Sequence, residues 1–293
     1  MPASKPNLVL TFAHGYSWGD LSIFFNSLKK TRFTGDVVVF ASCLNPDTTR
    51  TMRDHGVDVH KVFIPLVKLR NVLLLPGWKP WKFLLSLIPH QGSRRAIGKL
   101  AFNIMCARFA HFHDYLQKNV DRYGKVLVTD IRDVCFQVDP FEAADGIPLV
   151  SFLEPLRIKG GANGKWMEEA FGKELDPTLL DELVCCAGVT LGEAPAMLDY
   201  LTKMLSHLYE VKLMTPVAGV DQAVHNYLFH RRQLKGSTML ENGNPICMTM
   251  GHGDPFALDA NEQVNADGKI VAILHQFDRS PDLKRIMTAK FSS

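Results

Sequence analysis

The sequence predicts an α/β fold with a mostly parallel central sheet flanked by helices. Three observations predict it. Apolar residues make up 46% of the 293 residues and charged residues 22%, which is enough to form a full core. Strand and helix patterns alternate over the first 62 residues, as in sheets with crossover helices. Acidic residues directly follow a later buried strand. Without internal repeats or a long linker, residues 1–293 are expected to form a single domain.

The N-terminal elements follow from local patterns. Residues 7–13 are an apolar run that reads as a buried first strand. Asp20 stands where an N-cap would, ahead of apolar residues at helical spacing. Residues 37–41 predict a second strand, Asn45-Pro46 the start of a helix, and residues 57–62 a third strand.

The remaining helices and strands are expected after residue 100. Helical periodicity covers residues 101–120, and a buried strand is predicted over residues 125–129. Another strand is expected at residues 149–153, ending at Glu154-Pro155. Residues 175–208 are predicted to be largely helical with an interruption at 188–192, and residues 245–250 and 269–274 to form late strands.

The charge distribution is uneven although the formal net charge is only +3. No Asp or Glu occurs in residues 59–113, a basic, apolar insert that ends in a helix. Such asymmetry indicates an anionic partner or surface. The basic residues are too mixed with Leu and Trp for a nucleic-acid binder, so no nucleic-acid partner is expected. They are Lys61, Lys68, Arg70, Lys79, Lys82, Arg94, Arg95, Lys99 and Arg108.

The sequence favours a cytoplasmic location. Its six cysteines lack CxxC spacing and indicate reduced, buried thiols. The N-terminus has no apolar signal region, and no apolar run could span a bilayer. The insert at residues 59–113 suits peripheral contact with an anionic membrane on its inner face. The alternative is an excursion packed on the sheet with its charges in solvent.

The side chains that say most about function lie in residues 129–141. Asp130 and Asp133 follow an apolar strand, and ligands of open α/β sheets bind outside the carboxyl ends of strands. Carboxylates are hard ligands that suit Mg²⁺ or Mn²⁺, which bind through one or two carboxylates plus substrate phosphates. In the alternative reading, Asp130 caps a turn and Asp133 pairs with a base such as Arg132.

This stretch resembles the strand-end acidic motif of nucleotide-diphospho-sugar glycosyltransferases with the GT-A fold. That family typically has an apolar run, Asp-x-Asp, a second apolar run and Asp-Pro. Here the motif is the variant Asp130-Ile131-Arg132-Asp133, followed by Phe-Gln-x-Asp-Pro-Phe. The altered spacing leaves open whether Asp130, Asp133 or both bind the metal. The resemblance implies a single GT-A-like (Rossmann-like) domain.

The resemblance also implies a donor site at the first strand and its loop. Gly15 would let the backbone approach the ligand closely. Tyr16 could stack on a base, or be an ordinary half-buried aromatic. Arg108 could reach the diphosphate or the acidic pair, or lie on a solvated helix face. The residues implied to hold base and ribose are Thr11, Phe12, Ala13, His14, Gly15 and Tyr16.

Three later segments agree with this resemblance. Residues 186–192 resemble the strand and turn that line the acceptor side of such enzymes; the alternative is a glycine-containing break between helices. Asp221-Gln222-x-x-x-Asn226 matches a helix opening whose carboxylate lies beside the transferred sugar, although Asp221 also suits an N-cap. His275 follows a buried strand and could be the third metal ligand, or a hydrogen-bonded core residue.

The resemblance implies a metal-assisted glycosyltransferase acting on a nucleotide-diphosphate sugar and a carbohydrate or lipid-linked acceptor. Mn²⁺ or Mg²⁺ would be held by Asp130, Asp133 and His275. Arg108, Arg132 and Gln222 would contact the donor. In an inverting reaction, Asp221 or else Glu154 would deprotonate the acceptor hydroxyl; in a retaining one, Asp221 would orient the sugar.

Two other functions remain open. One is a non-catalytic sugar- or nucleotide-binding protein with a transferase-like fold, which the altered acidic spacing permits. The other is a phosphatase or phosphotransferase with Asp130 as nucleophile. The sequence favours it less, because the usual Asp-x-Asp-x-Thr/Val arrangement is missing.

Overall fold

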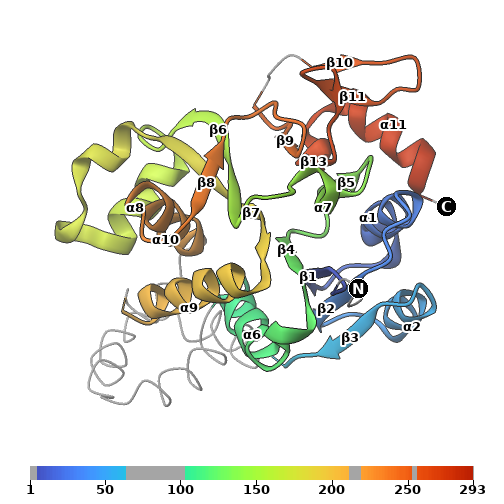
Figure 1. The fold of residues 1–293 in the computed structure, drawn as a ribbon, viewed down its shortest axis with the longest axis horizontal. Helices are drawn as coiled ribbons and strands as arrows, with labels where there is room; N and C mark the ends of the chain where they lie inside the picture. Colours follow the sequence, from blue (N-terminus) through green and yellow to red (C-terminus); the bar gives the residue numbers. More distant parts are fainter. Residues whose placement is uncertain (1–4, 64–102, 211–218, 253–255, 293) are drawn as a thin grey trace.

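The computed structural model describes residues 5–63, 103–210, 219–252 and 256–292, and it shows an α/β fold (Figure 1). A seven-stranded sheet has the strand order β3-β2-β1-β4-β7-β6-β8 and is mostly parallel. Most of the predicted insert, residues 64–102, lies outside the described residues.

The N-terminal half of the sheet is parallel, as predicted. It consists of β1 (Leu8–His14), β2 (Asp36–Ser42), β3 (Asp58–Lys61) and β4 (Lys125–Thr129). Helices α1 (Trp18–Lys30) and α2 (Pro46–Asp54) connect the first three strands.

The predicted start of α2 is confirmed and that of α1 is wrong. The Asn45 side chain accepts a hydrogen bond from Thr48 N, with Pro46 in the first turn. Ser17, not Asp20, is the N-cap of α1. Asp20 occupies the third helical position and accepts a hydrogen bond from Ser17 N at 2.8 Å, closing a capping box.

The prediction of a largely helical segment over residues 175–208 is wrong in its centre. β7 (Leu183–Glu193) lies antiparallel between β4 and β6, and α9 (Ala194–Glu210) begins only after it. Nearly every residue of β7 is buried, so the strand lacks the alternation of apolar and polar residues that distinguishes strands from helices.

The sequence predicted that strand β6 ends at Glu154-Pro155. This prediction is wrong, because β6 (Leu149–Arg157) continues to Arg157. Its pairing with β7 is irregular between Leu153 and Arg157, which accommodates a proline that cannot donate to the ladder. On its other side β6 pairs in parallel with β8 (Ser237–Leu240).

A second, three-stranded sheet brings the late strand β13 to the carboxyl end of β4. β13 (Ile273–His275) pairs with β5 (Val134–Phe136) and with β9 (Cys247–Thr249). The strand predicted at 269–274 is therefore split into β12 (Lys269–Ile270) and β13. β10 (Ala257–Leu258) and β11 (Val264–Ala266) form a small sheet with β12.

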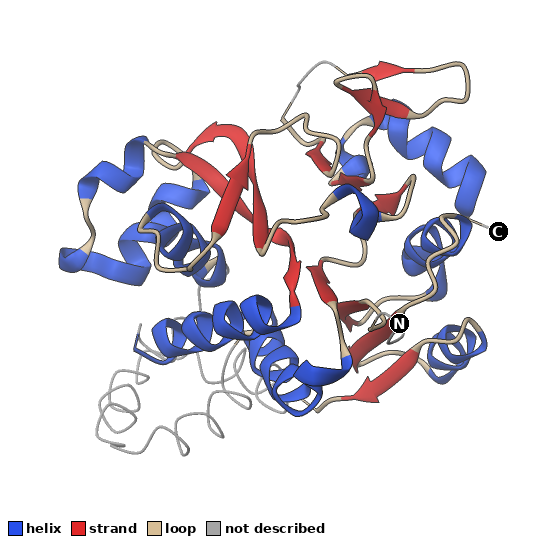
Figure 2. Cartoon of the chain, viewed as in Figure 1, coloured by secondary structure: helices blue, strands red, loops and turns tan. Residues whose placement is uncertain are grey.

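Helices cover both faces of the central sheet (Figure 2). Alternate residues of β1 divide between the two sides: Leu8 and Leu10 join one core cluster, and Val9 and Ala13 the other. The first cluster includes α6 (Ile104–Asn119), α8 (Ala162–Phe171), α9 and α10 (Val220–His230), and the second includes α1. α11 (Pro281–Phe291) packs on α1.

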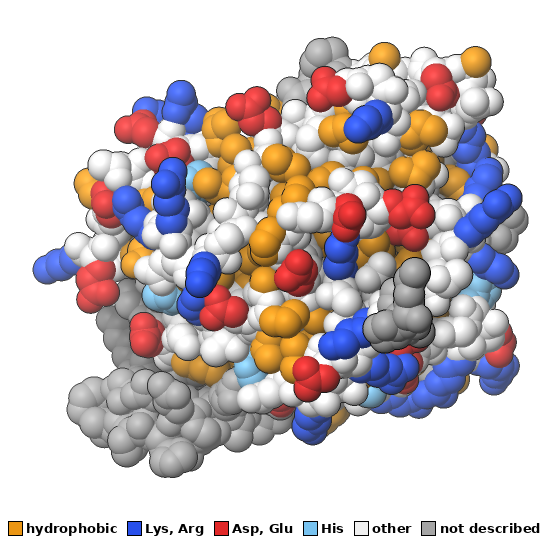
Figure 3. Space-filling model, viewed as in Figure 1, with side chains coloured by type: hydrophobic (Ala, Val, Ile, Leu, Met, Phe, Trp, Pro, Cys, Tyr) orange, Lys and Arg blue, Asp and Glu red, His pale blue; other side chains and the backbone are white. Residues whose placement is uncertain are grey.

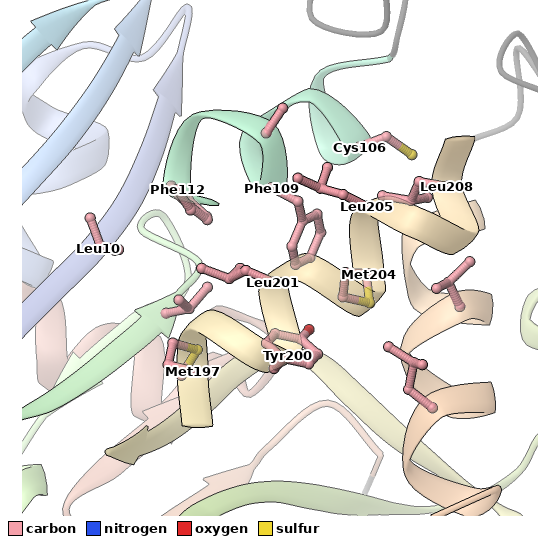
Figure 4. Close-up of a cluster of buried hydrophobic side chains, with 14 of the residues drawn as sticks. Leu10, Cys106, Phe109, Phe112, Met197, Tyr200, Leu201, Met204, Leu205 and Leu208 are labelled. Carbon is pink, nitrogen blue, oxygen red and sulfur yellow. The ribbon is translucent and has the colours of Figure 1, made fainter. Parts of the chain in front are cut away.

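Phe109 and Phe112 of α6 face Leu201 and Leu205 of α9 in the larger cluster (Figure 4). Together with the packing of α6 on β1, these contacts fix the helix beside the central sheet. They therefore fix any side chain that α6 directs toward the end of the sheet.

The short elements are α7 (Pro140–Ala143) and four 3-10 turns: η1 (Val120–Arg122), η2 (Gly172–Glu174), η3 (Pro177–Asp181) and η4 (Phe277–Arg279). Within the described ranges, no helix is long and apolar enough to cross a bilayer. On the face seen in Figure 3, Lys and Arg side chains lie among Asp and Glu. Five of the six cysteines are buried and none is in a disulfide, but Cys43 is exposed.

The buried imidazole of His225 on α10 predicts an acid-sensitive fold. Its ring lies 2.8 Å from Ser151 Oγ and 2.7 Å from Tyr200 Oη, and burial lowers the pKa of His225 from 6.5 to about 3. As pH falls from about 6.5 toward 3, the unfolded chain binds a proton that the folded chain does not, so stability falls.

We expect His225→Gln to reduce the pH dependence of the free energy of unfolding. The contribution of one histidine to this slope is at most about 1.4 kcal/mol per pH unit. Urea unfolding between pH 4 and 7 measures it. The exposed-site variant His55→Gln is the control and should follow the unmodified chain. An unchanged slope in His225→Gln would show that other groups cause the acid sensitivity.

Candidate functional site

Three potential metal ligands meet at the carboxyl end of β4. Asp130 follows β4, Asp133 precedes β5 and His275 ends β13; one ligand atom from each lies within 4.8 Å of the others. Gln276 N donates a hydrogen bond to Asp133 O at 2.7 Å, and Asp130 N donates one to Gly188 O at 2.8 Å. Strand pairing thus joins three segments that lie far apart in the sequence.

The imidazole of His275 is oriented toward the two carboxylates. Its Nδ1 lies 3.3 Å from Thr249 Oγ1 and 3.6 Å from Cys186 Sγ. Its Nε2 is buried, lies 3.7 Å from Asp130 Oδ2 and has no hydrogen-bond partner within the described part of the chain. A buried nitrogen in this situation fits a metal ligand, because metal-bound histidines are held through their other ring nitrogen.

Gly188 of β7 leaves room beside these ligands. A Cβ at this position would lie 2.6 Å from His275 Nε2 and 2.8 Å from Asp130 Oδ2. A side chain here would therefore occupy the space between imidazole and carboxylate. The free space, the partnerless nitrogen and the carboxylate oxygens together fit a divalent cation of the Mn²⁺ or Mg²⁺ class.

Arg108 of α6 is buried between two carboxylates rather than on a solvated helix face. Its guanidinium donates to Asp130 Oδ1, and its second terminal nitrogen lies 3.1 Å from Asp221 Oδ2. Burial alone would raise the pKa of Asp130, but Arg108 and His275 lower it to about 2. Burial raises the pKa of Asp221 despite Arg108. Asp130 is thus held as a carboxylate.

A cavity of about 290 Å³ opens beside the cluster. The end of β1 and the loop after it contribute Phe12, His14 and Tyr16 to its wall. Arg108, Arg132 and Arg279 also line it, and Arg132 lies 3.3 Å from Asp278. The cavity therefore combines aromatic groups with cationic groups next to the candidate metal ligands.

Other predicted donor residues hold the backbone around this cavity. Thr11 Oγ1 donates to Thr129 O at 2.8 Å and ties β1 to β4, while Ala13 is buried in the core on the α1 side. Gly15 adopts a positive φ of 69° and donates its N–H to Ser42 O. The Gln222 side chain accepts a hydrogen bond from Ala187 N at 2.9 Å and donates one to Cys185 O, so it joins α10 to β7.

Glu154 lies on β6. It lines a second cavity, of about 400 Å³, which is described further below. Its Oε2 is 3.1 Å from His252 Nε2. Burial would raise the pKa of Glu154, but His252 and the Cys186 thiol lower it. The sequence does not predict a role for His252 or Arg279, nor the contacts of Cys186 and Thr249 with His275. Among these, only Arg279 has a signal, because it lies soon after His275 in the sequence.

A scan against protein-family models and a search of curated proteins found no match to this chain. The fold and the site therefore rest on the chain's own geometry.

Removing the Arg108 guanidinium should destabilise the fold. We expect Arg108→Leu to lower the free energy of unfolding by about 3–5 kcal/mol, because it leaves the carboxylates of Asp130 and Asp221 without their buried counter-charge. The double variant Arg108→Leu/Asp221→Leu should recover part of this loss. Urea unfolding at pH 7 measures both; a single variant as stable as the unmodified chain would contradict the assigned role.

Proposed function

We propose that this chain is a metal-dependent glycosyltransferase of GT-A type that transfers a sugar from a nucleotide-diphosphate sugar to a hydroxyl acceptor. One observation carries the proposal: the Asp130–Asp133–His275 cluster lies at the carboxyl end of β4, beside a cavity walled by the loop after β1. Ligands of open α/β sheets bind at this edge, outside the carboxyl ends of the strands.

The charges around the cavity suit a diphosphate. A divalent cation held by Asp130, Asp133 and His275 would supply positive charge to the departing phosphate groups. Arg132 and Arg279 line the same cavity and add preorganised positive charge on the protein side. The aromatic groups Phe12 and Tyr16 provide flat apolar surface for a nucleotide base.

The two candidate carboxylates have different surroundings. Asp221 is buried and engaged by Arg108, so in this proposal it positions the guanidinium and, through it, Asp130. Glu154 lies on the wall of the second cavity and is the carboxylate available to an acceptor hydroxyl.

A non-catalytic binding protein is the second candidate, and one observation favours it. Arg108 already occupies Asp130 Oδ1, which reduces the oxygens available to a cation. Release of nucleoside diphosphate from a nucleotide sugar without acceptor separates the two functions. Slow, metal-dependent release supports the transferase, whereas tight donor binding without release supports the binding protein.

Metal and nucleotide should stabilise the chain together. With MnCl₂ and UDP, GDP or ADP at about a hundredfold excess over Kd, the folded state should gain about 2.7 kcal/mol, seen as a rise of several degrees in Tm. Asp133→Asn and His275→Ala should lose the metal-dependent part of the rise. Asp54→Asn, at an exposed carboxylate, is the control. A full metal-dependent rise in both Asp133→Asn and His275→Ala would contradict the metal assignment.

Contact with an anionic membrane remains a prediction from the sequence of residues 59–113. Co-sedimentation of the chain with liposomes of increasing phosphatidylserine content measures it. Binding should rise with anionic lipid and fall with added salt. Sedimentation that is independent of anionic lipid would contradict the prediction.

A further inference from the structure

A second cavity of about 400 Å³ lies beside β6, at the start of β7 and the loop after β8. Four of its lining side chains are apolar: Leu153, Pro155, Leu183 and Met248. Two others, Glu154 and Glu241, carry carboxylates. The cavity is thus an apolar surface with acidic hydrogen-bond acceptors, unlike the arginine-lined cavity beside Asp130.

Glu154 connects this cavity to the candidate metal ligands. The Cys186 thiol lowers the pKa of the Glu154 carboxyl on one side and lies 3.6 Å from His275 Nδ1 on the other. One side chain therefore separates the wall of the second cavity from the ligand cluster. The Glu154 side chain is only 8% exposed, so its carboxylate is held in place by its neighbours Cys186 and His252.

Hydrogen bonds of Asn242 hold the loop that carries Glu241 in place. The side-chain amide of Asn242 accepts from Thr249 N at 2.8 Å and donates to Thr249 O at 3.1 Å. These bonds fasten the loop to β9, which also holds the strand of His275. The second cavity therefore has a rigid wall, as expected of a binding site that is formed before its ligand arrives.

We infer that this cavity receives the acceptor of the proposed transfer reaction, and that the acceptor is a neutral carbohydrate. The inference rests on the proposed function. The C–H face of a sugar ring packs on apolar side chains, and its hydroxyl groups donate hydrogen bonds to carboxylates. Lys and Arg are missing from the described residues that line the cavity, and the two carboxylates repel a phosphate group. Glu154 accepts a hydrogen bond from the acceptor hydroxyl nearest the metal ligands.

Saturation-transfer NMR on the full chain tests this, with MnCl₂ and excess UDP, GDP or ADP present to fill the arginine-lined cavity. The probes are methyl glucoside, methyl galactoside and methyl mannoside, and glucose 1-phosphate is the anionic comparison. At least one methyl glycoside should bind, and more tightly than glucose 1-phosphate. Glu154→Gln should weaken that binding about tenfold or more, because a hydrogen bond to a charged acceptor is lost.

Glu241→Gln, at an exposed position that tolerates the change, should weaken binding less and carries the test if Glu154→Gln does not fold. Glu142→Gln is the matched control at an exposed glutamate on α7 and should bind like the unmodified chain.

The thermal shift with Mn²⁺ and nucleotide, measured on the same variants, separates this inference from the proposed function. If that shift is present but no methyl glycoside binds, glucose 1-phosphate binds more tightly, or both glutamate variants bind like the unmodified chain, the acceptor assignment is overturned and the transferase proposal stands. If the unmodified chain shows no shift, the transferase proposal fails and the acceptor assignment fails with it.

Discussion

The buried bridge from Arg108 to Asp130 and Asp221 is the interaction on which the site depends. It joins α6, the end of β4 and α10, three elements that also share the larger hydrophobic core. A guanidinium enclosed by protein needs anionic partners, and two carboxylates that face each other need a cation between them. Because the bridge holds Asp130 ionised and in position, the second oxygen of Asp130 faces His275 and the space beside Gly188.

β7 organises the surroundings of that bridge. Gly188 opens the space beside the cluster, Cys186 lies between His275 and Glu154, and Gln222 of α10 clamps the strand at Cys185 and Ala187. One cavity, with aromatic and cationic walls, lies on the Asp130 side, and the other, with apolar and acidic walls, lies on the Glu154 side. The first cavity is lined by Asp130 and Asp133, and Cys186 lies between His275 and Glu154 in the wall of the second. Two cavities of unlike chemistry near one ligand cluster suit a transfer between two substrates, and this supports the proposed function.

The predictable parts of the structure are those with a local signal. The alternation of strands and helices in the first 62 residues, and the position of Asp130 and Asp133 after a strand, depend on nearby residues, and the structure bears them out. Periodicity does not predict β7, because a strand buried on both faces has none, although the resemblance implies a strand at residues 186–192 within it. The extent of β6 is not predicted because Pro155 lies at an irregular pairing. Contact of Arg108 with the acidic pair is one of the alternatives that the sequence offers. The second partner of Arg108, Asp221, and the contact of His252 with Glu154 join distant segments, and no spacing in the sequence encodes them.

The proposed function requires that Asp130, Asp133 and His275 hold a divalent cation. A crystal structure of the full chain grown with MnCl₂ and a nucleoside diphosphate, with anomalous data recorded near the manganese absorption edge, tests it most directly. We expect one anomalous peak bounded by carboxylate oxygens of Asp130 and Asp133 and by His275 Nε2, with the diphosphate on its open side. A nucleotide bound in the cavity with no peak at these three residues would contradict this expectation.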